Sequence, residues 1–126
     1  MSHTIAYNSD SHIIEIKFQG DIILSELQEL FSESVRIAKE QNCFLFLSDY
    51  REATVKLSTL EIHNLPKILS DIFAPYGIPA TKLKRALVVA KDLKDYHFFE
   101  TVTLNSGQNT KIFQDVAEAK EWLSTN

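Results

Sequence analysis

Two short apolar runs, "CFLFL" at residues 43–47 and "RALVVA" at residues 85–90, constrain the fold more than any other feature of this chain. Neither run alternates between apolar and polar residues, so each places apolar side chains on both faces of an extended backbone. Strands of this kind lie in the interior of parallel sheets that are covered on both sides. The two runs therefore predict an α/β protein built around a mainly parallel sheet.

The first half of the chain predicts a hairpin followed by a helix. "HTIAY" and "IIEIKFQG" flank the turn-forming cluster "NSDSH", and the second of them alternates apolar and polar residues, as a half-exposed strand does. Apolar residues then recur every three or four positions over residues 21–42, which indicates an amphipathic helix. Its start is open: Ser25 with Gln28 forms a capping box, or Asp21 caps from further back.

The second half predicts three more helices and a strand. A stripe from Leu65 to Tyr76 indicates a helix, and Pro66 within it predicts either a kink or a short first helix. Residues 92–107 predict a helix that ends at Gly107, and "TKIFQ" predicts a short strand. The closing helix over 115–124 opens with a capping box from Asp115 to Glu118.

Alternating strands and helices join neighbouring parallel strands by right-handed crossovers. The expected fold class is thus α/β, with a mainly parallel five-stranded sheet and an N-terminal antiparallel hairpin. The 126 residues, 44% of them hydrophobic, suit one domain over residues 1–126.

The two interior strands also raise the question of what covers the second face of the sheet. Crossovers of one hand tend to place their helices on one side. The cover is a helix that crosses the sheet, a bound apolar ligand or a second copy of the chain. Because soluble monomers rarely expose large apolar patches, we expect a homodimer or a protein partner.

Composition and motifs give no sign of catalysis. The net charge of −4 and the scattered basic residues argue against nucleic-acid binding. No apolar run reaches the roughly 20 residues of a membrane span, and the start has no targeting pattern, so we expect a cytoplasmic protein. The four histidines lack the spacing of a metal site, and the chain has neither a P-loop nor a nucleophile elbow. We therefore expect a non-enzymatic protein with no cofactor, no metal and no catalytic residue.

Asp49, Tyr50 and Arg51 directly follow the first apolar run. Ligands of open α/β sheets bind at the carboxyl ends of the strands, which makes these residues candidates for ligand or partner binding. The alternative is structural: Asp49 caps loop amides, and Arg51 pairs with Asp49 or Glu52 to hold the turn.

A second candidate surface surrounds the end of the helix that contains Pro66. Phe73 and Tyr76 are candidate partner contacts there, and a lipid headgroup or an acidic protein face would suit the cations that follow. Those cations are Lys82, Lys84 and Arg85. Phe98 stands beside Phe99 in the next predicted helix, where only one of the two can face the sheet, so Phe98 is a further candidate contact.

Three segments, "IIEIKFQGDIILSEL", "FLSDYREA" and the closing "KIFQDVAEAKEWL", resemble the SpoIIAA-like family, the fold of STAS domains (sulfate transporter and anti-sigma-factor antagonist). The resemblance covers nearly the whole chain and extends to single-domain relatives likened to SEC14-type (CRAL-TRIO) lipid carriers. It implies a four-turn β/α superhelix.

In anti-sigma antagonists of that family, a serine in an Asp-Ser-Ser-Gly-Leu segment is phosphorylated. The resemblance places Ser58 and Thr59 at the hydroxyl positions, with Leu57 in place of the Asp and Leu60 in place of the Gly. The same hydroxyls are also explained as a helix cap completed by Glu61. The functions to be compared are a regulatory, protein-binding and self-associating module, with phosphorylation as a special case, and a carrier or sensor of a lipid or another small apolar ligand.

Overall fold

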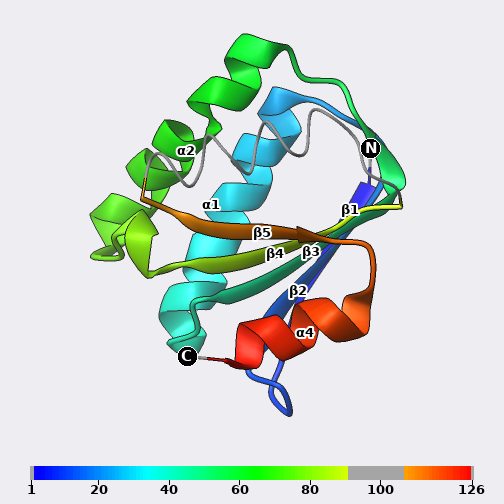
Figure 1. The fold of residues 1–126 in the computed structure, drawn as a ribbon. Coiled ribbons are helices and arrows are strands. Elements are labelled where there is room, and N and C mark those ends of the chain that lie inside the picture. Colours follow the sequence, from blue (N-terminus) through cyan, green and yellow to red (C-terminus); the bar gives the residue numbers. More distant parts are fainter. Residues whose placement is uncertain (1, 91–106, 126) are drawn as a thin grey trace.

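The computed structural model of the chain describes residues 2–90 and 107–125. Its helices and strands follow in order, as Figure 1 shows. They are β1 (Ser2–Asn8), β2 (Ile13–Ile22), α1 (Leu24–Gln41), β3 (Leu45–Val55), α2 (Thr59–Phe73), the 3-10 turns η1 (Ala74–Tyr76) and η2 (Ala80–Lys82), β4 (Lys84–Val88), β5 (Asn109–Phe113) and α4 (Val116–Ser124). The helix expected over 92–107, and Phe98 with it, lies outside the described residues.

The five strands form one mixed sheet in the order β1-β2-β3-β4-β5. β1 and β2 pair antiparallel, while the β2–β3, β3–β4 and β4–β5 pairs are all parallel. The two apolar runs contribute to β3 and β4, both of which have neighbours on each side. The predictions of an α/β class, an N-terminal hairpin and two interior parallel strands are confirmed.

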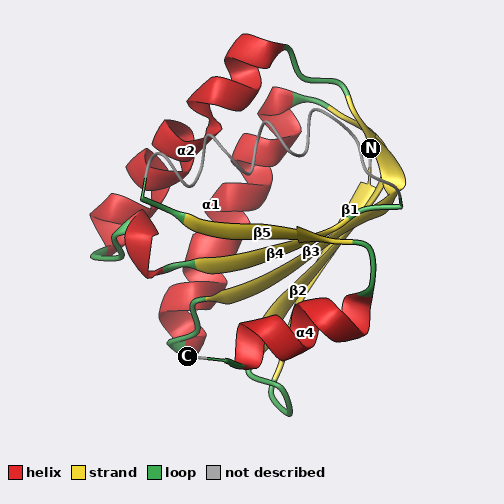
Figure 2. Cartoon of the chain, viewed as in Figure 1, coloured by secondary structure: helices red, strands yellow, loops and turns green. Residues whose placement is uncertain are grey.

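The sheet is covered on both faces by helices of the same chain. α1 and α2 lie on one face and α4 lies on the other (Figures 1 and 2). The smaller core under α4 contains Leu47 and Val88 from the sheet and Ala119 and Leu123 from the helix, all buried. Of the three expected covers for the second face, the crossing helix is therefore present, and the argument for a homodimer from an uncovered face was wrong.

α1 buries the predicted face, but both predicted caps were wrong. Its first residue is Leu24, and the preceding Ile23 provides no side-chain cap. β2 continues through Asp21, which pairs with Thr54 of β3, so Asp21 belongs to a strand. Ser25 then stands inside the first helical turn, where its hydroxyl is too late to cap the helix.

α2 confirms its predicted start. The Ser58 hydroxyl accepts a hydrogen bond from the Glu61 amide at 3.1 Å, and the Glu61 carboxylate accepts one from the Ser58 amide at 2.8 Å. The helix then runs unbroken past Pro66, so the alternative of a short first helix was wrong.

Among residues 2–90 and 107–125, no helix combines the length and apolar character needed to cross a membrane.

α4 begins with the predicted cap, since the Asp115 carboxylate accepts a hydrogen bond from the Ala117 amide at 3.2 Å. That bond replaces the expected capping box with Glu118.

Candidate functional site

Asp49, Tyr50 and Arg51 lie inside β3, not at its carboxyl end. The strand runs on to Val55 because the second half of β2 pairs with it. The register shifts between these strands: Lys17 stands opposite Asp49, but Gln19 stands opposite Glu52. β3 therefore has one extra residue here, a β-bulge, and bulges of this kind redirect side chains.

Alternation along β3 separates the three candidate residues onto two faces. Tyr50 lies on the α1–α2 face, where its ring stacks on Phe18 with centroids 4.5 Å apart. Asp49 and Arg51 lie together on the opposite face, and two hydrogen bonds join the guanidinium to the carboxylate, at 3.0 and 2.8 Å. The predicted cluster is thus two sites, one buried and one open.

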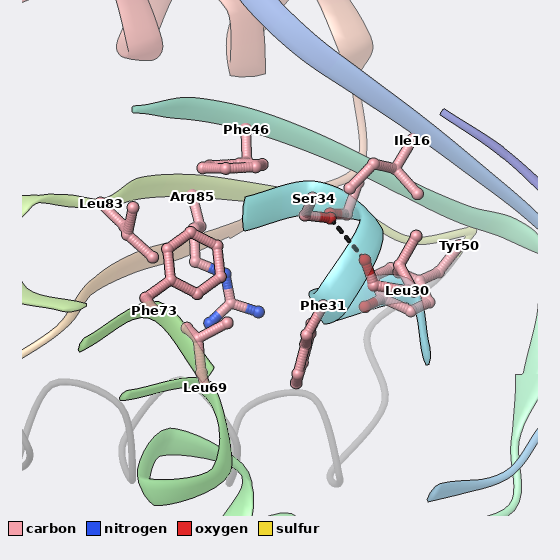
Figure 3. Close-up of a pocket in the computed structure, with 11 residues that line it drawn as sticks. Ile16, Leu30, Phe31, Ser34, Phe46, Tyr50, Leu69, Phe73, Leu83 and Arg85 are labelled. Carbon is pink, nitrogen blue, oxygen red and sulfur yellow. Dashed lines mark hydrogen bonds between the residues drawn. The ribbon is translucent and has the colours of Figure 1, made fainter. Parts of the chain in front are cut away.

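The buried site centres on Arg85, which was predicted to be a surface cation. Its side chain is only 6% exposed and points into the core between the sheet and α1–α2 (Figure 3). Its guanidinium carbon lies 5.9 Å from the centre of the Phe31 ring. The surface prediction was wrong because Arg85 has the same parity as Leu87 and Val89, whose side chains face this core.

A small cavity of about 20 Å³ adjoins Arg85. Its lining includes Phe31, Ser34, Ser48, Tyr50, Phe73 and Arg85. The Ser34 hydroxyl donates to the Leu30 carbonyl at 2.8 Å. This volume is about what one water molecule requires.

Burial shifts the pKa of the two polar groups that flank this cavity but leaves their protonation at neutral pH unchanged. It raises the pKa of Tyr50 to about 12 and lowers the pKa of Arg85. A guanidinium starts from so high a pKa that it stays charged at neutral pH, while the phenol stays neutral. A neutral phenol and a charged guanidinium thus line a cavity with room for about one water. Polar groups at such a place favour one packing arrangement of the core, because each needs a hydrogen-bond partner.

The structure places Phe73 and Tyr76 in different environments. Phe73 is 1% exposed and meets the ring of Phe46 edge to face, with centroids 6.2 Å apart. Tyr76 lies in η1 and is 39% exposed. Of the cations predicted beside them, Lys84 donates to the carbonyls of Trp122 and Thr125 at the end of α4, at 2.6 and 2.7 Å.

The open site is a hollow of about 410 Å³ on the α4 face, which we call the charged groove. Its lining includes Thr4, Ala6, Glu15, Lys17, Asp49 and Arg51. α4 packs mainly on β3, β4 and β5 and, among the described residues, leaves much of the outer part of this face open.

Opposite charges pair across the strands at the charged groove. Lys17 meets Glu52 at 2.9 Å, and Lys120 of α4 meets Glu15 at 3.5 Å. The Arg51 guanidinium lowers the pKa of Asp49, which also accepts a hydrogen bond from the Arg51 amide at 3.0 Å. Asp49 thus bonds to both the side chain and the backbone of Arg51, which confirms the predicted pairing, but the pair lies at a bulge inside a strand and not in a turn.

We expect Asp49→Asn to lower the free energy of unfolding by about 0.5–1 kcal/mol at neutral pH, because the amide keeps one acceptor but loses the ion pair. The folded pKa of Asp49 lies below its unfolded value. Its stabilisation is therefore complete above the unfolded value, roughly 3.9, and is lost as the pH falls through the folded one. Urea unfolding at pH 7 and pH 3 should show the difference between wild type and variant shrink in acid.

Asp71→Asn is the matched control. Asp71 pairs with Lys67 on the exposed side of α2, and both side chains are mostly exposed. Its replacement should leave stability unchanged. Equal effects of the two substitutions would contradict a special role for Asp49 at the bulge.

A third feature lies where α1 and α2 begin. α1 follows β2 and α2 follows β3, and because these strands are parallel both helices start at the same end of the sheet (Figure 1). The Lys56 amide, just after β3, donates a hydrogen bond to the Ile22 carbonyl at the end of β2 at 2.8 Å. Two large apolar side chains are exposed there: Ile23 is 46% exposed and Leu60 is 69% exposed. We define the helix-start surface as Ile23, Ser58, Thr59 and Leu60.

Sequence reasoning missed the buried polar group around Arg85 and two ion pairs of the charged groove, Lys17 with Glu52 and Lys120 with Glu15. The burial of Arg85 could have been predicted from the alternation along β4, because Arg85 lies on the same side of the strand as Leu87 and Val89. Within the described ranges, no group of three or more His, Cys, Asp or Glu side chains could hold a metal ion. Comparison of the chain with models of known protein families and with curated protein sequences finds no match.

Proposed function

We propose that this chain is a non-enzymatic regulatory module that binds a protein partner through the helix-start surface and also associates with itself. The observation that carries the proposal is the exposure of Leu60, whose side chain is 69% exposed in the first turn of α2. A leucine left in water at a helix start contributes little to the stability of its own chain. Its apolar surface is available to be buried by a partner.

The surroundings of Leu60 fit a protein interface. Ile23 adds a second exposed apolar group, and Ser58, Thr59 and Glu61 supply polar groups around them. An apolar centre with a polar rim is the usual anatomy of a protein–protein contact. Neither Ile23 nor Leu60 belongs to the core between the sheet and α1–α2.

The resemblance to SpoIIAA-like domains supports the regulatory part of the proposal. We infer that the chain forms the four-turn β/α superhelix of that family and that a phosphate at the start of α2 controls partner binding. Ser58 already uses its hydroxyl as the helix cap, whereas Thr59 is exposed at the first helical position. Both residues are exposed, and free amides and the helix dipole favour a phosphate there, so we infer that Thr59, whose phosphorylation leaves the Ser58 cap intact, is the acceptor.

The alternative of an apolar-ligand carrier draws no support from the described residues. The cavity near Arg85 has room for about one water, while an acyl chain needs a pocket of several hundred Å³. The larger hollow, the charged groove, is lined in part by Ala6, Leu47 and Val116, but an apolar ligand there would also have to desolvate ionised side chains such as Lys17 and Arg51.

The test replaces Leu60 by Asp. Partners captured from the host by the wild-type protein are identified by mass spectrometry, and the purified pair is titrated calorimetrically. Leu60→Asp should weaken binding at least tenfold, which corresponds to about 1.4 kcal/mol, because a charge would enter the apolar centre of the contact. Its melting temperature should stay within experimental error of wild type, since Leu60 is not part of the core.

Tyr76→Asp is the control, since Tyr76 is another exposed apolar residue beyond the far end of α2. It should leave partner binding unchanged. Binding that survives both Leu60→Asp and Ile23→Asp would overturn the proposed surface.

A further inference from the structure

β1 is an edge strand without the usual protection against pairing. Its one neighbour in the described sheet is β2, so its other side presents backbone amides and carbonyls. Its sequence, "SHTIAYN", contains no Lys, Arg, Asp, Glu or Pro. Its register with β2 is continuous from Ser2 to Asn8, so no bulge twists the edge away. Charges, prolines and bulges are the devices by which sheet edges avoid pairing with another chain.

The opposite edge of the same sheet carries such a device. β5 has five residues, against seven for β1, and its central Lys111 is exposed. A lysine on an edge strand opposes pairing because its charge would be brought against a second backbone. The chain therefore protects one edge of its sheet and leaves the other able to pair.

The sequence of β1 is also complementary to itself when reversed. In an antiparallel pair centred on Ile5, Ser2 stands opposite Asn8, His3 opposite Tyr7, and Thr4 opposite Ala6. Each pair joins like with like: two small polar residues, two aromatic rings and two small side chains. We propose that β1 pairs with β1 of a second copy of this chain, antiparallel and about a two-fold axis at Ile5.

The two faces of the strand agree with this register. Residues directly opposite in an antiparallel pair lie on the same face of the sheet. Thr4 and Ala6 line the charged groove, so both belong to the α4 face. His3 and Ile5 lie on the other side, where His3 bonds to Glu33 of α1 at 3.2 Å and Ile5 packs on the core. The pairing therefore joins two five-stranded sheets into one, with matching helices on matching sides.

The pairing also changes the charged groove. In a single chain, Thr4 and Ala6 form its outer border at the free edge of the sheet. In the pair, Thr4 meets Ala6 of the partner subunit across the axis. The two charged grooves then form one continuous groove across the dimer. In each copy, β1 of the partner subunit extends the border formed by Thr4 and Ala6.

This inference deepens the self-association in the proposed function and is independent of the helix-start surface, none of whose residues belongs to β1. The test introduces like charges at Thr4 and Ala6 in two double variants of opposite sign. Thr4→Lys/Ala6→Lys would place lysine opposite lysine twice, and Thr4→Glu/Ala6→Glu would do the same with glutamate. Like charges directly opposite destabilise a strand pair, whereas opposite charges stabilise it.

Sedimentation velocity provides the readout. We expect wild type to sediment at twice the 14.4 kDa mass of one chain, each double variant to sediment as a single chain, and an equimolar mixture of the two variants to recover the dimer. The circular dichroism melt of each variant reports whether its fold is intact. Asn109→Lys, which adds a charge to the β5 edge, should leave the dimer unchanged.

Three results would overturn the inference. They are a wild-type protein that stays a single chain at its highest soluble concentration, lysine and glutamate variants that remain dimeric, and folded variants that fail to recover a dimer on mixing. Loss of partner binding in Leu60→Asp with the dimer intact would leave both proposals standing. Loss of the dimer in Leu60→Asp would assign self-association to the helix-start surface and so exclude β1.

Discussion

Phe73→Ala is expected to lower the free energy of unfolding by about 3–5 kcal/mol, the range for removing a buried aromatic ring. Phe73 is 1% exposed, meets Phe46 edge to face and lines the small cavity beside Arg85. Its removal would enlarge a space that now has room for about one water, next to a buried charge. Urea unfolding followed by circular dichroism measures the loss.

Tyr76→Ala is the matched control, three residues further on. Tyr76 is 39% exposed, so its loss should change stability by no more than about 0.5 kcal/mol. The comparison separates the two interpretations of Phe73, because a partner contact would change binding and leave stability as it was. Similar stabilities for the two variants would contradict the placement of Phe73 in the core.

Leu123→Ala is expected to cost about 2–5 kcal/mol and to expose apolar surface on the α4 face. Leu123 is 1% exposed and packs with Ala119 against Leu47 and Val88 of the sheet. Since α4 is the helix that covers these strands, loosening it uncovers the interior of the sheet. Unfolding in urea gives the energy, and increased fluorescence of an apolar dye at neutral pH reports the exposed face.

Leu60→Ala makes the same chemical change at an exposed position and should alter stability by no more than about 0.5 kcal/mol. If Leu123→Ala were as stable as Leu60→Ala, another molecule would have to cover the α4 face. The dimer proposed through β1 does not depend on this result, because its strands meet at the sheet edge.

Much of the fold followed from local patterns. "CFLFL" and "RALVVA" predicted interior strands, and the helical period of Leu27, Leu30 and Phe31 predicted the buried face of α1. The boundaries were less predictable. β3 continues to Val55, and the missed signal was the alternation of half-buried Ala53 and Val55 with exposed Thr54 after the bulge.

The candidate site was predictable only in part. The pairing of Asp49 with Arg51 was one of two alternatives, and it is present. That Tyr50 lies on the other face follows from the alternation along β3, but its place beside Arg85 depends on the parallel pairing of β3 with β4, whose register sets Phe46 opposite Arg85. The unbroken α2 was not predicted by local propensity alone: Pro66 is buried, as are Leu65 and Leu69 beside it, and its carbonyl accepts a hydrogen bond from Gln108 at 2.8 Å.

Within the described residues, the sequence by itself determined the order of strands and helices and which side of α1 is apolar, because these properties depend on the period of a few neighbouring residues. Only the tertiary structure decided that α4 covers the second face, that Arg85 is buried and that β1 is an open edge. These features depend on contacts between residues far apart in the chain. Their energy comes from the burial and pairing of surfaces that do not exist until the sheet has formed.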